Sequence, residues 1–236
     1  METIVSPHAD LSYEQQPISY FKGFDWSKAS KSDSVSFSRA SGFKETGMSV
    51  NEMALLYDLL EKKRPKKIVE LGRNYGTSTR MFIQHVLRHG GSVESWDLKH
   101  WDGFIDGMNE NGYNFIPGKG EEFVMSPIRN DASVTLKVAH SIKTHIENEG
   151  RWVDFLLVDT EHGLEHALGE YMRWREYLNS GALIAFHDST LIGPKRAIEI
   201  IKEVEEMASP GGGRLVKEYI NEREDGYGIH ILEWKG

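Results

Sequence analysis

The sequence predicts an α/β protein built on a Rossmann-like, doubly wound sheet of seven strands. The sheet is expected to be mostly parallel, with helices on both faces and an antiparallel C-terminal hairpin strand. Short apolar runs alternate with segments of helical periodicity from about residue 49 onward. The run 153–158 is almost continuously apolar, which is typical of a strand buried on both faces of a parallel sheet. Asp225-Gly226, between two further apolar runs, favours a closing hairpin.

The first elements have clear boundaries in the sequence. Ser49 and Glu52 form the pattern of a capping box at the start of a helix that ends before Pro65. A strand over 67–71 leads through a glycine-containing turn into a helix that starts near Thr77. Gly90-Gly91 closes that helix and opens a second strand, which ends at Asp97.

The later elements are less evenly marked. Residues 100–120 are rich in glycine, asparagine and aromatic residues, and no element is predicted there. The remaining predicted elements are a strand over 123–129 ending at Asn130-Asp131, a helix over 133–148, a strand ending at Asp159, a helix over 164–178, a strand over 182–186 ending at His187-Asp188, a helix opened by Pro194, and hairpin strands over 214–220 and 228–234.

Composition limits the classes of function. The chain has 236 residues, enough for one domain over 47–236 preceded by an N-terminal arm or cap over 1–46. With 36 acidic and 28 basic residues the net charge is −8, so no nucleic-acid partner is expected. No apolar run reaches the roughly 18 residues of a membrane span. The absence of cysteine fits a cytoplasmic protein, and the aromatic arm favours a homodimer.

The turn after the first strand has the spacing of a nucleotide-type site. Glu70, Gly72 and Gly76 form an acidic-x-Gly-x-x-x-Gly pattern. The glycines allow the backbone to approach a ligand, and the following helix directs free N–H groups toward it. The Gly-x-Gly-x-x-Gly pattern of dinucleotide folds is missing, which disfavours a nicotinamide dehydrogenase.

Acidic residues recur where the predicted strands end. Ligands of open α/β sheets bind outside the carboxyl ends of the strands. Any single acidic residue there has an ordinary explanation as a turn or cap residue. Five in successive strand-end positions predict a shared site; they are Glu70, Asp97, Asp131, Asp159 and Asp188.

The turn, the strand-end acids and the closing hairpin together resemble the class I S-adenosylmethionine (SAM)-dependent methyltransferases. The resemblance implies that Asp97 binds the ribose hydroxyls of SAM, because a carboxylate accepts two hydrogen bonds at once. It places the other cofactor-binding residues around the same ligand: Glu70, Gly72 and Gly76 beside its methionine and ribose parts, Asp131 near the adenine amino group, and Ser78 at the helix start.

A second group of residues resembles the metal-dependent small-molecule O-methyltransferases of the catechol, macrolide and aminocoumarin sugar, and cephalosporin-modifying types. The resemblance rests on Asp159-Thr160-Glu161-His162 and His187-Asp188. It implies a divalent metal, Mg²⁺ or Mn²⁺, at Asp159, His187 and Asp188, with Asp159 and His162 in catalysis and His162 as general base. His187 departs from the family, which has an acidic residue there. It is expected either to ligate the metal or to hydrogen-bond a neighbour and leave the metal to the two aspartates.

The expected function is therefore SAM-dependent methyl transfer to a hydroxyl of a small molecule. Three alternatives stay open: a metal-independent methyltransferase with a nitrogen or macromolecular acceptor, another SAM-using or nucleotide-using enzyme such as an aminopropyl transferase, and a non-catalytic SAM-binding protein. No motif identifies the acceptor, because a fold does not specify a substrate.

Overall fold

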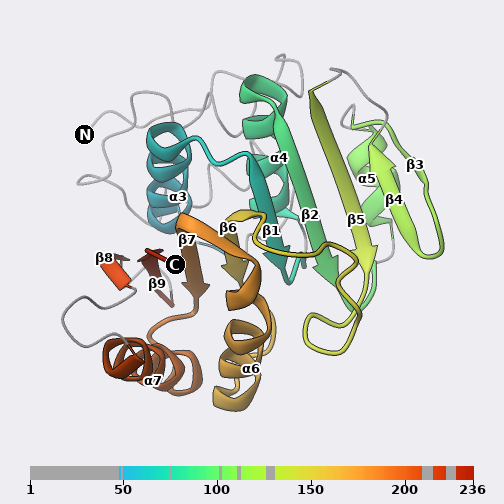
Figure 1. Cartoon of the computed structure of the whole chain (residues 1–236). Coiled ribbons are helices and arrows are strands. Elements are labelled where there is room, and N and C mark those ends of the chain that lie inside the picture. Colours follow the sequence, from blue (N-terminus) through green and yellow to red (C-terminus); the bar gives the residue numbers. More distant parts are fainter. Residues whose placement is uncertain are drawn as a thin grey trace.

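A nine-stranded mixed sheet is the centre of the part of the chain that the structure describes (Figure 1). The computed structural model describes residues 48, 50–74, 76–100, 103–110, 113–125, 131–208, 215–221 and 227–236. The predicted arm over 1–46 and the turn at Asp225-Gly226 lie outside the described residues. The strands are β1 (Lys67–Leu71), β2 (Gly91–Asp97), β3 (Phe115–Pro117), β4 (Glu122–Met125), β5 (Ala132–Val138), β6 (Val153–Val158), β7 (Leu178–His187), β8 (Leu215–Asn221) and β9 (Ile229–Trp234).

The strand order confirms the predicted fold class. The order is β3-β4-β5-β2-β1-β6-β7-β9-β8, and the five strands from β5 to β7 are parallel. Strand β9 runs antiparallel to β7, as predicted for the C-terminal hairpin. The chain winds outward from β1 in one direction and then from β6 in the other, so the topological switch point lies between β1 and β6. Ligands of doubly wound sheets bind at this point.

Helices cover both faces of the sheet (Figure 1). Alternate residues of β6 show the division: Phe155 packs with α3 and α4, and Leu156 packs with α6 and α7. Both side chains are fully buried, as the continuous apolar run predicts. The helices are α3 (Val50–Lys63), α4 (Thr77–His89), α5 (Phe104–Glu110), α6 (Leu164–Trp174) with a 3₁₀ turn over Arg175–Tyr177, and α7 (Ile192–Ala208). Within the described residues, no helix combines the length and the apolar character that a membrane span needs.

The sheet differs from the prediction between residues 115 and 138. The helix predicted over 133–148 is wrong, because residues 132–138 form β5, which pairs in parallel with β2. Val134 and Val138 are four residues apart, a spacing that fits both a helix and a strand. The buried Leu136 between them has the strand period of two. A further unpredicted strand, β3, pairs with β4 at the edge of the sheet, and β3 and β5 together explain nine strands instead of seven.

A close backbone contact joins the ends of β1 and β6. Gly72 has φ +86°, and a Cβ atom built on it would lie 1.8 Å from the backbone oxygen of Asp159. The amide of Asp159 donates a hydrogen bond to the carbonyl of Leu71 at 2.8 Å. Glycine is thus required here for contact between two parts of the chain, in addition to the ligand approach predicted from the motif.

We predict that Gly72→Ala lowers the free energy of unfolding by more than about 2 kcal/mol, because the added methyl group collides with backbone at a positive φ. Gly107→Ala is the matched control, since a Cβ at that helical position meets nothing within 4 Å. The control should change stability by less than about 1 kcal/mol. Urea unfolding followed by circular dichroism measures both variants. Equal midpoints for Gly72→Ala and the parent chain would contradict the constraint.

Candidate active site

A cavity of about 630 Å³ opens at the carboxyl ends of the central strands. This volume lies within the range of about 300–1,000 Å³ that small-molecule sites occupy. The residues around it come from the ends of β1, β2, β5, β6 and β7 and from the start of α4. Eight residues predicted from the sequence line it: Gly72, Gly76, Ser78, Asp97, Asp159, His162, His187 and Asp188.

Glu70 does not line this cavity. Its side chain is fully buried on the α4 face of the sheet and accepts hydrogen bonds from the hydroxyls of Ser78 (2.5 Å), Thr79 (2.6 Å) and Ser95. Burial raises the pKa of Glu70 from 4.5 to about 7, although these hydroxyls and the nearby Arg73 favour the charged form. The contacts connect β1, β2 and the first turn of α4 beneath the glycine-containing turn.

The predicted position of Asp131 is wrong. Asp131 precedes β5 instead of following a parallel strand, and its carbonyl accepts a hydrogen bond from the amide of Gly91 at the start of β2. Residues 91 and 132 are paired across the two strands, as are 97 and 138. Asp131 and Asp97 therefore lie at opposite ends of seven-residue strands, roughly 20 Å apart. Residues 139–141, which follow β5, line the cavity instead.

The end of β2 and the start of α4 form one wall of the cavity. Asp97 Oδ2 accepts hydrogen bonds from the backbone amides of Arg73 (2.9 Å) and Asn74 (3.0 Å). Within the described part of the chain, Asp97 Oδ1 accepts no hydrogen bond. Thr77 Oγ1, at the start of α4, is also buried without a partner in the described part of the chain. A free carboxylate oxygen and a helix N-terminus with an unpaired hydroxyl suit a ligand that has both ribose hydroxyls and a carboxylate.

The ends of β6 and β7 meet around a buried imidazole. His187 Nδ1 lies 2.9 Å from Asp159 Oδ1 and 3.2 Å from Asp188 Oδ2, and its Nε2 lies 3.3 Å from Glu52 Oε2. Burial alone lowers the pKa of His187, but these carboxylates outweigh it and hold the pKa well above its usual range. Burial raises the pKa of Asp159, while the hydrogen bond and charge of His187 overcome burial and lower the pKa of Asp188.

His162 lies beside this group and faces solvent. Its Nε2 is 2.7 Å from Asp188 Oδ2, and 48% of its side chain is exposed. Asp159, His162 and Asp188 each place a potential ligand atom within 4.8 Å of those of the other two. Backbone contacts hold these residues in place. Asp188 has φ +54°, and a Cβ on Gly193 would lie 2.1 Å from the carbonyl oxygen of His162. The start of α7 thus packs directly on the His162 loop.

Glu52 belongs to the site, although its sequence pattern predicts only a helix cap. Ser49 lies outside the described residues, so the capping box stays a prediction. The carboxylate of Glu52 is buried, accepts a 2.7 Å hydrogen bond from the amide of Gly228, and faces His187. It precedes His187 by 135 residues, and no local pattern signals such a contact. His166 and Tyr227 also line the cavity and have no motif that predicts it.

Comparison with known protein families agrees with this arrangement. The family model described as a methyltransferase domain matches residues 69–189, from β1 to the residues after β7. The chain belongs to the methyltransferase domain family. The chain is also 26% identical over 133 residues to the uncharacterized protein y4gI of Sinorhizobium fredii. The match covers 56% of this chain but 14% of that protein, so the chain spans a small part of the curated relative's length.

Solved structures share the fold of this methyltransferase domain. An O-methyltransferase from Bacillus cereus in complex with SAH has a TM-score of 0.53 at 15% identity, covering 87% of this chain and 90% of the other. A methyltransferase from Geobacter sulfurreducens has the same score and identity, covering 92% and 94%. MycE of the mycinamycin pathway, in complex with Mg, SAH and mycinamycin VI, has a TM-score of 0.54 at 11% identity, covering 84% and 53%. These similarities show a SAM-dependent methyltransferase fold.

We predict that the buried Glu70 makes the stability of the methyltransferase domain depend on pH. Its pKa is raised to about 7 in the folded state, so the folded chain holds a proton that the unfolded chain releases above pH 4.5. Stability should therefore fall as pH rises from about 4.5 to 7. In Glu70→Gln this decrease in the free energy of unfolding, about 3 kcal/mol between pH 4.5 and pH 7, should be absent.

Urea midpoints at pH 5 and pH 8 measure this difference. Glu206→Gln is the control, because Glu206 is an exposed residue of α7 and should leave the pH dependence unchanged. Parallel pH profiles for Glu70→Gln and the parent chain would contradict the assignment.

Proposed function

We propose that this chain transfers the methyl group of SAM to a hydroxyl of a small molecule. One observation carries the proposal: a single cavity contains Asp97 and the start of α4 on one side and Asp159, His162 and Asp188 on the other. The first group suits a nucleoside with a carboxylate, and the second suits deprotonation of a hydroxyl. The O-methyltransferase and SAH named for the Bacillus cereus structure support the same reading.

In this proposal, Asp97 and α4 bind the cofactor. SAM, when bound, supplies an electrophilic methyl group on a sulfonium. Asp97 Oδ1 accepts hydrogen bonds from the ribose, while Oδ2 keeps the turn in shape through the amides of Arg73 and Asn74. The first amides of α4 and the Thr77 hydroxyl bind the carboxylate of the methionine part. Gly72 and Gly76 line the same wall.

Asp159 and Asp188 are the proposed holders of a divalent cation, Mg²⁺ or Mn²⁺. Carboxylate oxygens are the donors that these ions prefer, and the two side chains lie close enough to share one ion. Such an ion lowers the pKa of a hydroxyl that coordinates to it. We assign His187 to orienting the two carboxylates, because both its ring nitrogens already face carboxylate oxygens.

His162 is the proposed general base. Its imidazole is half exposed at the cavity wall, where the hydroxyl of an acceptor can reach it. Asp188, at 2.7 Å, would stabilise the imidazolium that forms when His162 takes the proton. The rigid strand ends keep the base and the cofactor side in fixed relation, which favours alignment of acceptor oxygen, methyl carbon and sulfur.

The homodimer and the cytoplasmic location stay predictions.

We predict that the chain binds S-adenosylhomocysteine and that Asp97→Asn weakens this binding by roughly 10-fold to 100-fold. The asparagine oxygen still accepts the turn amides, but the charged acceptor for the ribose is lost. Isothermal titration calorimetry measures the affinity, with NAD as a comparison ligand. Asp58→Asn, an exposed site on α3, should bind like the parent chain. Absence of binding by the parent chain, or preference for NAD, would overturn the proposed function.

We predict that His162→Gln lowers methyl transfer by about 100-fold while leaving cofactor affinity unchanged, since general-base catalysis contributes about 10²-fold to 10⁴-fold. The assay follows formation of S-adenosylhomocysteine with a panel of catechols and sugars as acceptors. His145→Gln, an exposed site, is the control. Removal of divalent ions with EDTA should also abolish activity. Full activity in EDTA would favour a metal-independent methyltransferase, and loss of metal affinity in His162→Gln would make this residue a ligand.

A further inference from the structure

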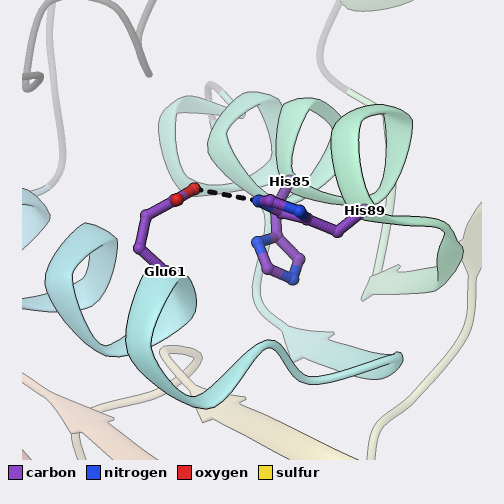
Figure 2. A group of neighbouring side chains, drawn as sticks. All are labelled: Glu61, His85 and His89. Atoms are coloured by element: carbon purple, nitrogen blue, oxygen red, sulfur yellow. Dashed lines mark hydrogen bonds and ion pairs between the residues drawn. The ribbon is translucent and has the colours of Figure 1, made fainter.

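A second group of potential metal ligands lies away from the cavity, between α3 and α4. Figure 2 shows Glu61 on α3 facing His85 and His89 on α4. The two histidines are four residues apart, so they lie on the same face of the helix. This face is directed at the last turns of α3, and the cluster adjoins Pro65, which precedes β1. No residue of the cluster lines the proposed active site.

The distances between these side chains approach those of a metal centre. Each of the three residues has one potential ligand atom within 4.8 Å of those of the other two. His89 Nε2 lies 3.1 Å from Glu61 Oε1, and the imidazole rings of His85 and His89 have centroids 4.9 Å apart. Two ligands about 2.0 Å from a tetrahedral Zn²⁺ are about 3.3 Å apart. The Glu61–His89 pair already has nearly this separation.

The buried His85 is prepared to act as a ligand. Its Nε2 lies 3.0 Å from the carbonyl oxygen of Pro65, which can only accept a hydrogen bond, so Nε2 carries the proton. Its Nδ1 then has a lone pair, and this atom is buried without a hydrogen-bond partner among the described residues. In Figure 2 one ring nitrogen of His85 points toward the contact between Glu61 and His89. Metal-binding histidines commonly donate their second ring N–H to a backbone carbonyl in this way.

The surroundings leave the cluster accessible to an ion. The side chains of His89 and Glu61 are 16% and 27% exposed, so an ion can enter from solvent. Burial lowers the pKa of His85 to about 4, which keeps its imidazole neutral at pH 7. Two cations lie nearby. Arg88 Nη1 is 3.4 Å from Glu61 Oε1, and Lys66 donates a hydrogen bond to the carbonyl of His89.

We propose that Glu61, His85 and His89 form a binding site for Zn²⁺ that joins α3 to α4. Two imidazoles and one carboxylate are a ligand set typical of zinc, with water in the fourth position. The site differs in chemistry from the aspartate-rich pair in the cavity, which suits harder cations. The bound ion stabilises the packing of α3, the helix that also positions Glu52 against His187.

The test compares the full chain with His89→Gln after dialysis against EDTA. Calorimetry with Zn²⁺ should find one more bound equivalent in the parent chain than in His89→Gln, whose affinity at this site should drop by more than about 100-fold. Bound Co²⁺ should give the visible bands of a tetrahedral centre in the parent chain and in His162→Gln, and none in His89→Gln. Zn²⁺ should raise the Tm of the parent chain and of His162→Gln by equal amounts.

Two further variants make the test decisive. Arg88→Gln should tighten Zn²⁺ binding several-fold, because it removes the cation that shares the Glu61 oxygen. Glu61→Gln replaces His89→Gln if circular dichroism shows that the latter does not fold. The proposal is overturned if the parent chain and both ligand variants bind the same number of zinc ions. In that case the contact between Glu61 and His89 is an ion pair only. Neither result depends on SAM binding or methyl transfer.

Discussion

The contact of the buried His187 ring with three carboxylates is the interaction on which the arrangement of the site depends. An isolated charge in a protein interior is strongly unfavourable unless oppositely charged groups surround it. Here Glu52, Asp159 and Asp188 surround the ring, and they come from α3, β6 and the end of β7. Because each carboxylate is itself buried or partly buried, all of these elements must come together at once. The folded chain thereby places Asp159 and Asp188 side by side with little freedom to separate.

Backbone contacts add a second constraint around the same charges. The β1–β6 contact at Gly72 and the packing of Gly193 on the loop of His162 leave no space for a side chain. Loops held in this way keep functional groups in a constant geometry, which catalysis by positioning requires. Leu98 and Tyr227 also line the cavity and are 69% and 61% exposed, so their side chains are available to contact a ligand.

The two groups of potential ligands are separated in both position and chemistry. The pair of aspartates lies at the carboxyl ends of the strands, where ligands of doubly wound sheets bind. The cluster of Glu61, His85 and His89 lies beside the residues that enter β1, among helices that serve the core. Oxygen donors suit magnesium and manganese, while imidazoles suit zinc. Under the two proposals, the ion at the aspartates and the ion between α3 and α4 would therefore not compete for the same ligands.

The sequence by itself determined the alternation of strands and helices, because burial on one or both faces leaves a periodic apolar pattern. It also placed Asp97, Asp159 and Asp188 at one edge, since parallel strands end on the same side. It did not determine β5, because the spacing of its valines fits two periods. Only the tertiary structure decided that Glu70 is buried beneath the turn and that Glu52 contacts His187. Such contacts join residues that are distant in the chain. Their energies depend on how far the polar side chains are removed from water, which cannot be predicted from the neighbouring sequence.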